Sequence, residues 1–304
     1  MPWPAAAVAT DLTDAAVPGL VAALDLPGIV DVHVHFMPDR MLRKVWQYFD
    51  EAGPLVGRRW PIHYRGDDDQ RLTVLRGLGV RAFPALSYPH RPGMAQWLND
   101  WAAQFAATTP DNIPSGTFFP EPGAADYVAA AIERGTRIFK AHVQVGQYDP
   151  RDPLLDPVWG VLAAAAVPVV VHCGHGPVPG VHTGAEPFAQ VLARHPRLVA
   201  VVAHLGMPEY TAFLDLADRY PGVHLDTTMA FTDFTEAQAP FPRHERPRLE
   251  SLGLAGRLLY GSDFPNIPYP FAHQVESLVR LDLGDEWLRA VLWGNGSRLL
   301  GVPR

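Results

Sequence analysis

Short hydrophobic runs recur along the chain, and a stretch with helical periodicity follows most of them. Runs such as 167–171 are apolar at nearly every position, which is typical of parallel strands buried on both faces. Eight strands separated mostly by helices favour an α/β fold, a (β/α)₈ TIM barrel, over an open sheet. The expected strands are 28–36, 80–86, 116–119, 136–145, 167–172, 198–204, 223–227 and 258–261, and the expected helices are 11–26, 70–78, 94–107, 124–134, 154–166, 185–195, 209–219, 272–280 and 284–293.

Two segments stand outside this repeat. Residues 1–27 are expected to form an N-terminal extension with a helix, and residues 28–304 a single barrel domain. A long connection, 37–69, follows the first strand, and long connections are usually functional. It is interpreted as a lid-like insertion that binds a planar or carboxylated substrate, with a solvated insertion packed by its own tryptophans as the alternative. Its candidate substrate-binding residues are Arg40, Trp46, Trp60, Tyr64 and Arg65.

Candidate chemistry follows the ends of the expected strands. In the sequence Asp-Val-His-Val-His at 31–35, His33 and His35 share one face of a strand. Two such imidazoles can bind one divalent metal through neutral ring nitrogens, although two histidines with ordinary hydrogen bonds would give the same pattern. Four later hydrophobic runs also end in potential ligands, and a closed barrel brings these strand ends together. These residues are Lys140, His172, His204 and Asp263.

Composition narrows the classes of function. Hydrophobic residues make up 48% and charged residues 19% of the 304 residues, as in a globular protein with a large core. A formal net charge of −7 gives no electrostatic support for nucleic-acid binding. The single cysteine, Cys173, excludes an intrachain disulfide, and no apolar run has the length of a membrane span. We therefore expect a cytoplasmic protein that binds a small-molecule substrate, not nucleic acid or membrane, with a homo-oligomer as an open alternative.

An ordered set of motifs gives a family resemblance. The stretches are DVHVHF at 31–36, FKAHVQVG at 139–146, VVVHCGHG at 169–176, VVAHLGMPEY at 201–210, LLYGSDFP at 258–265 and WGNGSRLLG at 293–301. Together they resemble the amidohydrolase superfamily, in the amidohydrolase-related branch that includes aminocarboxymuconate-semialdehyde decarboxylase-like proteins. The matches extend over nearly the whole chain beyond residue 27.

The resemblance implies one divalent metal, most commonly zinc, with manganese or another ion as alternatives. Its implied ligands are His33, His35, His172 and Asp263, together with a bound water. Asp263 would also accept the proton of that water. His204 would orient the water, polarise the substrate or ligate a second metal, and a histidine packed beneath the site is the alternative reading.

Three further residues have open roles. In some superfamily members a lysine at the position of Lys140 is carbamylated and bridges two metals, but Lys140 can equally bind a substrate carboxylate or pair with Asp31. His142 shares the face of Lys140 and competes for the same role. His175 follows His172 in a glycine-flanked loop, where it contacts substrate or solvent. One metal is the favoured interpretation.

The predicted function is that of a metal-dependent hydrolase, in which a metal-bound hydroxide attacks an amide, ester or lactone carbon. A metal-dependent, non-oxidative decarboxylase of an aromatic or enoic acid is the alternative from the same branch. A catalytically inactive binding protein is the third reading, and the intact set of candidate ligands argues against it.

Overall fold

The computed structural model describes residues 12–303, and their contacts divide them into two compact units. Unit 1 comprises the described residues up to Val34, residues Asp39–Phe83 and the described residues from Thr227 onward. Unit 2 comprises His35–Pro38 and Pro84–Asp226. Residues 1–11 of the expected N-terminal extension lie outside the described residues, and the single domain over 28–304 stays a prediction.

In unit 1, two segments that are distant in sequence lie side by side. Strand β1 (Ile29–Val30) pairs in parallel with β2 (Val80–Pro84), where Ile29 lies opposite Val80. Beyond β1 the chain stays extended beside the segment that follows β9 (Leu258–Leu259). The amide of Val32 donates to the carbonyl of Tyr260 at 2.9 Å, and residues 34 and 264 form a parallel bridge. The first expected strand therefore continues past β1 as extended backbone.

Helices surround these strands in unit 1. The capping box of Asp67 and Gln70 shows why α4 begins where it does, because each side chain accepts from the backbone amide of the other. The helices are η2 (Asp14–Ala16), α1 (Val17–Ala23), α2 (Asp39–Glu51), α3 (Gly53–Val56), α4 (Asp68–Gly77), α11 (Asp233–Glu236), η4 (Arg243–Glu245), α12 (Arg246–Leu254), α13 (Phe271–Val279), α14 (Asp285–Arg289), the π-helical turn η5 (Ala290–Gly294) and α15 (Asn295–Leu300). Because η5 connects α14 to α15, the last helix runs further than expected.

Unit 2 contains a run of parallel strands in sequence order, from β4 to β8. Their register places His142 at the end of β5 opposite His172 at the end of β6. Residues of β6 and β7 are completely buried, as the apolar runs predicted. The strands of unit 2 are β3 (Asn112–Ile113), β4 (Ser115–Thr117), β5 (Ile138–His142), β6 (Val169–His172), β7 (Ala200–Val202) and β8 (Val223–Asp226).

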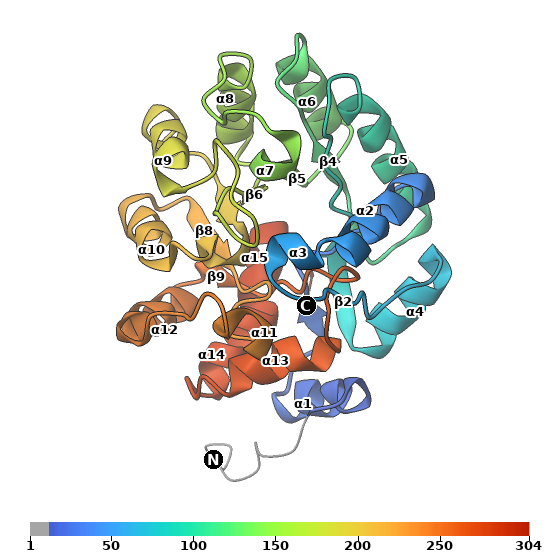
Figure 1. The fold of residues 1–304 in the computed structure, drawn as a ribbon, viewed down its shortest axis with the longest axis vertical. Coiled ribbons are helices and arrows are strands. Elements are labelled where there is room, and N and C mark those ends of the chain that lie inside the picture. The colour runs from blue at the N-terminus through green and yellow to red at the C-terminus, as the bar shows by residue number, and fades with distance from the viewer. Residues whose placement is uncertain (1–11, 304) are drawn as a thin grey trace. The chain divides into compact units, whose positions relative to one another are not determined.

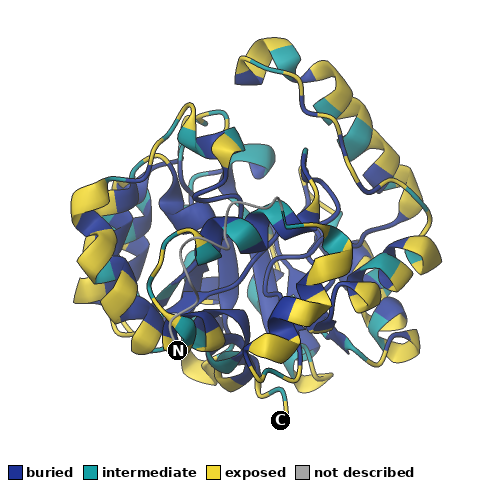
Figure 2. Ribbon diagram, turned by 90° about the horizontal axis from the view of Figure 1, so that it is seen from below, coloured by how far each residue is buried: buried dark blue, intermediate teal, exposed yellow. Residues whose placement is uncertain are grey.

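In unit 2, helices α5, α6, α8, α9 and α10 lie outside strands β4 to β8 (Figure 1). Their outward faces are exposed while the strands are buried (Figure 2), which explains the amphipathic pattern of the helices. The helices are α5 (Ala95–Thr108), α6 (Ala124–Glu133), α7 (Val143–Gly146), α8 (Asp156–Ala165), α9 (Ala185–Arg194), η3 (Ala203–Gly206) and α10 (Tyr210–Arg219).

Every expected strand of unit 2 is shorter in the structure, and the backbone shows why two of them end early. The strand expected at 136–145 ends at His142, because the helical turn α7 begins there. The strand expected at 198–204 ends at Val202, because His204 and Leu205 adopt left-handed backbone conformations. The apolar pattern does not reveal either change, since Val143 and Val145 follow β5, and Ala203 and Leu205 follow β7.

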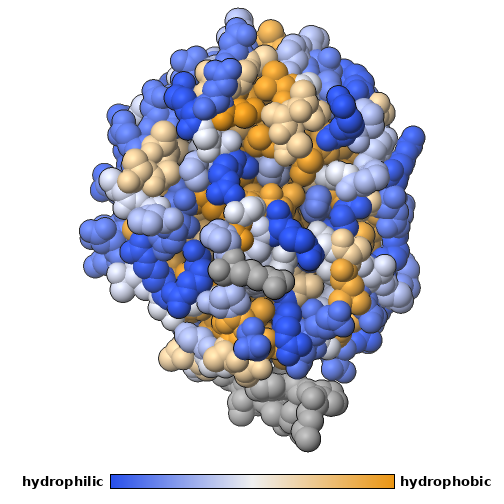
Figure 3. Space-filling model, turned by 180° about the vertical axis from the view of Figure 1, so that it is seen from behind, coloured by the Kyte–Doolittle hydropathy of each residue, from blue (hydrophilic) through white to orange (hydrophobic). Residues whose placement is uncertain are grey.

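The visible surface mixes charged and polar side chains with smaller apolar areas (Figure 3). Over residues 12–303, the structure includes no helix that is both long enough and apolar enough to span a membrane.

Candidate functional site

Three predicted metal ligands come together in the structure. His33, His35 and Asp263 each offer one ligand atom, and these atoms all lie within 4.8 Å of one another. The residues are 1%, 3% and 9% exposed. Imidazole nitrogens and a carboxylate oxygen suit zinc and similar divalent ions. The donor set therefore fits the metal that the family resemblance implies.

Hydrogen bonds fix the backbone that carries these ligands. The amide of Asp263 donates to the carbonyl of His33 at 2.9 Å. The buried carboxylate of Asp31 accepts, through Oδ1, from the amides of His33 and Ser262, both at 3.1 Å. Asp31 thus joins the two segments that supply His33 and Asp263. Its position on the face of His33 was the sequence signal for a role near the site.

Each ligand histidine holds its Nδ1 atom against a fixed partner. The Nδ1 of His35 donates to the carbonyl of Leu86 at 2.8 Å, and the hydroxyl of Thr228 lies 3.1 Å from the Nδ1 of His33. The Nε2 of His33 lies 3.6 Å from Oδ1 of Asp263. Metal-binding histidines typically use one ring nitrogen as the ligand and bind a protein group with the other. The two rings are therefore arranged to present Nε2 to an ion.

Asp263 has a backbone conformation that a non-glycine residue rarely adopts, with φ of +70°. Such strain clusters at functional sites, where surrounding contacts hold it in place. Here the amide of Asp263 is bonded to His33, and its carbonyl accepts from the amide of Asn266 at 2.9 Å. The carboxylate is therefore fixed by contacts on both sides of its own peptide.

Three predicted site histidines form a cluster in unit 2. The rings of His142 and His172 stack, with centroids 4.1 Å apart and an interplanar angle of 12°. The ring of His204 meets His172 edge-on at 4.7 Å. The Nε2 of His172 donates to the carbonyl of Gly176 at 2.8 Å, which leaves the lone pair on Nδ1. Among the described residues, His172 does not belong to the donor group of His33, His35 and Asp263.

Lys140 is completely buried on β5, and its carbonyl accepts from the hydroxyl of Thr117 at 2.8 Å. The pKa of His142 lies well below its ordinary value. The main cause is desolvation by burial, and the nearby His172 and Lys140 lower this pKa further. The binding of a substrate carboxylate by Lys140 stays a prediction.

A tight turn positions His204. Its φ is +56°, and its amide donates to Oδ1 of Asp226 at 2.9 Å. The turn continues through Gly206, where a Cβ would lie 1.9 Å from the ring of Phe213. Asp226, at the end of β8, thus acts on the site through the backbone of His204.

His175 has a protein partner, the carboxylate of Glu209. Its Nδ1 contacts Oε2 of Glu209, and the other oxygen of Glu209 accepts from the amide of Ala185 at 3.5 Å. Glu209 was not singled out in the sequence, because a pairing across 34 residues leaves no local signal. Cys173 is buried, and burial raises the pKa of its thiol, which disfavours a thiolate.

The aromatic residues of the insertion point into unit 1. Trp60 and Tyr64 are buried, and Trp60 stacks on Phe49 at 4.9 Å. The hydroxyl of Tyr64 donates to Asp14 and accepts from the amide of Phe271. The aromatic side chains of the insertion therefore pack both within it and against residues outside it.

The remaining candidates of the insertion lie nearer the surface. Arg40 is exposed, and Arg65 forms an ion pair with Asp50. The guanidinium of Arg65 lies 5.7 Å from the ring centre of Trp46. The substrate-binding role of these residues and of Trp46, Trp60 and Tyr64 stays a prediction.

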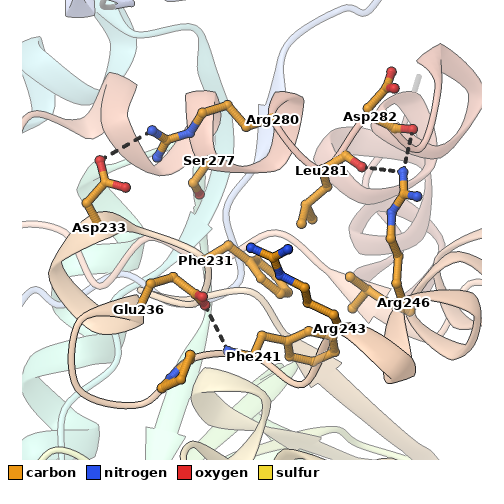
Figure 4. A pocket seen from close by; sticks show the side chains of 12 residues that line it. Phe231, Asp233, Glu236, Phe241, Arg243, Arg246, Ser277, Arg280, Leu281 and Asp282 are labelled. Carbon is orange, nitrogen blue, oxygen red and sulfur yellow. Dashed lines mark hydrogen bonds and ion pairs between the residues drawn. The ribbon is translucent and has the colours of Figure 1, made fainter.

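Unit 1 also contains a cavity of about 640 Å³ between segment 231–249 and the end of α13 (Figure 4). Several of its charged side chains bond to groups of the same lining, some of them backbone groups. Asp233 pairs with Arg280 at 3.2 Å, and Arg246 donates to the carbonyls of Leu281 and Asp282. Its lining includes none of the predicted site residues.

The sequence profile of a family described as Amidohydrolase matches residues 30–302. No curated protein matches the chain.

Solved structures from several organisms are similar to this chain. An uncharacterized TIM-barrel protein from Bordetella bronchiseptica is 20% identical with a TM-score of 0.66, and the match covers 90% of this chain and 98% of that chain. The 5-carboxyvanillate decarboxylase from Novosphingobium aromaticivorans, complexed with manganese, is 16% identical with a TM-score of 0.59, covering 90% and 96%. A probable 2-pyrone-4,6-dicarboxylic acid hydrolase from Acinetobacter baumannii is 13% identical with a TM-score of 0.60, covering 90% and 99%. These matches confirm the predicted (β/α)₈ fold.

Proposed function

The chain belongs to the amidohydrolase family, and from this premise we propose that it is a metal-dependent hydrolase. Its reaction is the addition of water to an amide, ester or lactone carbon of a small, carboxylated or aromatic substrate. The donor group of His33, His35 and Asp263 carries the proposal. Both of its histidines already hold Nδ1 against a protein group, as metal ligands do.

Zinc is the first candidate for the ion, and manganese is the alternative. Both accept imidazole and carboxylate ligands, and manganese is bound in the decarboxylase from Novosphingobium aromaticivorans. His172 is a further proposed ligand through Nδ1, because its Nε2 donates to Gly176. The family resemblance supports one ion per chain.

When bound, such an ion supplies Lewis acidity and lowers the pKa of water from 15.7 to about 7. Asp263 accepts the proton of the attacking water on its carboxylate and passes it to the leaving group. His204, held by Asp226, donates to the oxygen on which negative charge develops. Lys140 binds a carboxylate of the substrate, since a buried cation is stabilised by an anionic partner.

A non-oxidative decarboxylase is the second candidate, and the burial of Lys140 favours it as much as hydrolysis. The carboxylate that Lys140 binds would then be the leaving group. Asp263 or His204 would deliver a proton to the carbon that loses carbon dioxide. Two structural neighbours with different activities, a decarboxylase and a probable hydrolase, illustrate that one fold serves both reactions.

The test begins with metal content. Elemental analysis of the purified protein should find about one divalent ion per chain, and His33→Ala should lose it because one ligand is removed. The control His90→Ala changes an exposed histidine and should retain the ion. Metal-free wild-type protein with full activity would overturn the mechanism.

Turnover then separates the candidate reactions. The metal-loaded protein is assayed with lactones, amides and hydroxybenzoates, and both ring opening and carbon dioxide release are measured. Hydrolysis that is lost in His33→Ala supports the first proposal. Release of carbon dioxide would instead support the decarboxylase. A metal-loaded protein that turns over none of these compounds would favour a binding protein without catalysis.

A further inference from the structure

Asn266 links the insertion to the candidate metal ligand Asp263. It is 2% exposed and lies in the segment after Asp263. Its amide donates to the carbonyl of Asp263 at 2.9 Å. Its side-chain oxygen accepts from Nε1 of Trp46 at 3.1 Å, and its carbonyl accepts from Nε1 of Trp60 at 2.7 Å. One buried residue therefore bonds to the Asp263 peptide and to two indoles of the insertion.

Further contacts attach the insertion to the same segment. The amide of His63 donates to the carbonyl of Ile267 at 3.0 Å. The ring of Tyr64 lies 4.9 Å from the ring of Phe264, the residue after Asp263. Together with the two indoles, these contacts reach three of the four residues from 264 to 267. The segment after Asp263 is thus held mainly by the insertion.

The insertion is also attached to the loop that follows Thr228. The ring of Trp60 meets Phe234 edge-on at 5.0 Å, and the guanidinium of Arg58 lies 3.6 Å from the centre of the Phe234 ring. Gln238 accepts from Arg58 at 3.1 Å and donates to the carbonyl of Val56 at 2.8 Å. The insertion therefore contacts the segment after Thr228 and the segment after Asp263. Both Thr228 and Asp263 are partners of the His33 ring.

These contacts have a consequence for the strained backbone of Asp263. A residue at φ +70° relaxes unless its neighbours hold it. Its restraints include the bond to the carbonyl of His33 and the bond from the amide of Asn266, whose own position depends on Trp46 and Trp60. Loss of the indole bonds would free Asn266 and, through it, the direction of the carboxylate.

We propose that Asn266 is a positioning residue that couples residues 39–66 of the insertion to the candidate metal ligand Asp263. The proposal rests on the proposed metal site. Because coupling between two equilibria is reciprocal, the anchored insertion raises metal affinity, and a bound metal stabilises the insertion. The insertion is then a support of the metal site as well as a candidate lid.

The test uses the double variant Trp46→Phe/Trp60→Phe, which removes both indole donors and keeps aromatic rings in place. The control is Trp97→Phe, which changes a tryptophan that is 48% exposed on α5. Apparent dissociation constants for zinc and manganese are measured on chelator-treated protein by competition with a metal-binding dye. Outer-shell substitutions typically weaken metal affinity about 10- to 100-fold, and we expect a loss in this range for the double variant only.

A second readout follows the insertion itself. Limited proteolysis within 39–66 should slow when zinc is added to the wild type and to Trp97→Phe, but not to the double variant. If the double variant unfolds, Trp46→Phe alone serves the same comparison, because it removes one donor from a partly exposed side chain. The coupling is supported if Trp46→Phe binds zinc more weakly than the wild type, with a smaller loss than expected for the double variant, and keeps the circular dichroism spectrum of the wild type.

Two negative results have different meanings. Wild-type affinity in the double variant, or in a folded Trp46→Phe where the double variant unfolds, overturns the coupling and leaves the metal site intact. A wild-type protein that binds neither zinc nor manganese overturns the proposed function and this inference together.

Discussion

At the scale of single residues, the site is defined as much by hydrogen-bond acceptors as by ligands. The carbonyl of Leu86 requires a proton on Nδ1 of His35, so a neutral ring has its lone pair on Nε2. Asp31 and Asp226 act in a related way, because each accepts from a backbone amide beside a candidate site histidine. These carboxylates hold the backbone of two candidate site histidines, His33 and His204.

We predict that Asp263→Asn separates chemistry from metal binding. The amide keeps the shape and one acceptor oxygen, but it loses the negative charge and cannot take a proton. The variant should retain much of its metal and lose turnover about 10²-fold or more, as expected for a lost general base. Elemental analysis and kcat on the identified substrate provide the measurements. Wild-type kcat with full metal would transfer the proton role to His204.

If Lys140 binds the substrate carboxylate as proposed, Lys140→Ala should leave metal content unchanged while activity falls. The alternative, a carbamylated Lys140, predicts that a second metal is lost and that bicarbonate aids reconstitution of the wild type. Metal content and the KM for a carboxylated substrate distinguish them. Two ions bridged through Lys140 in a crystal structure would contradict the prediction.

The donor group of His33, His35 and Asp263 could be proposed from the sequence, whereas most of the groups that hold these residues in place could not. His33, His35 and Asp263 each end a hydrophobic run, and that signal is local. Thr228 lies 195 residues from His33, and its hydroxyl is one of many in the chain. Such pairs arise from tertiary contacts, which no pattern of spacing contains.

At the scale of elements, strand ends were harder to predict than strands. Apolar runs identified β5, β6 and β7, because burial on both faces leaves a strong pattern. The left-handed turn at His204 ends β7 early, and its cause is the acceptor Asp226 on the next strand. The insertion was expected from its length, but its attachment through Asn266 depends on indole bonds across 220 and 206 residues.

A carboxylate at the start of α8 gives a pH prediction for the α8–α9 pair. A hydrogen bond from Nε2 of His195 at 2.9 Å, with Arg194 at 3.2 Å, holds the pKa of Asp156 below its ordinary value. A carboxylate with a lowered folded pKa stabilises the protein above its unfolded pKa, and that contribution disappears as the pH falls through the folded value.

Asp156→Asn should therefore be less stable than the wild type at pH 7, and the difference should shrink as the pH falls below about 3.8. Denaturant unfolding at a series of pH values measures it. The control Asp100→Asn changes an exposed carboxylate and should show no such trend. A difference that persists at the lowest pH at which the protein remains folded would show that packing, not charge, is responsible.

At the scale of the whole molecule, metal binding should appear as stability. An ion that binds only the folded chain raises the free energy of unfolding by about 2.7 kcal/mol at one hundred times its dissociation constant. Zinc added to chelator-treated wild type should therefore raise the Tm, and His33→Ala should show little of that rise. An equal rise of the Tm in both proteins would show that zinc binds at a site that does not depend on His33.

The contact between Asp31 and Ser262 joins residues 231 positions apart. Ribosomes make the chain from its N-terminus, so His33 and His35 leave the exit tunnel long before Asp263 has been translated. The full donor group of His33, His35 and Asp263 therefore forms only after Asp263 has been translated. On the proposed function, a chain truncated before Asp263 would hold the two histidines without the carboxylate that takes the proton.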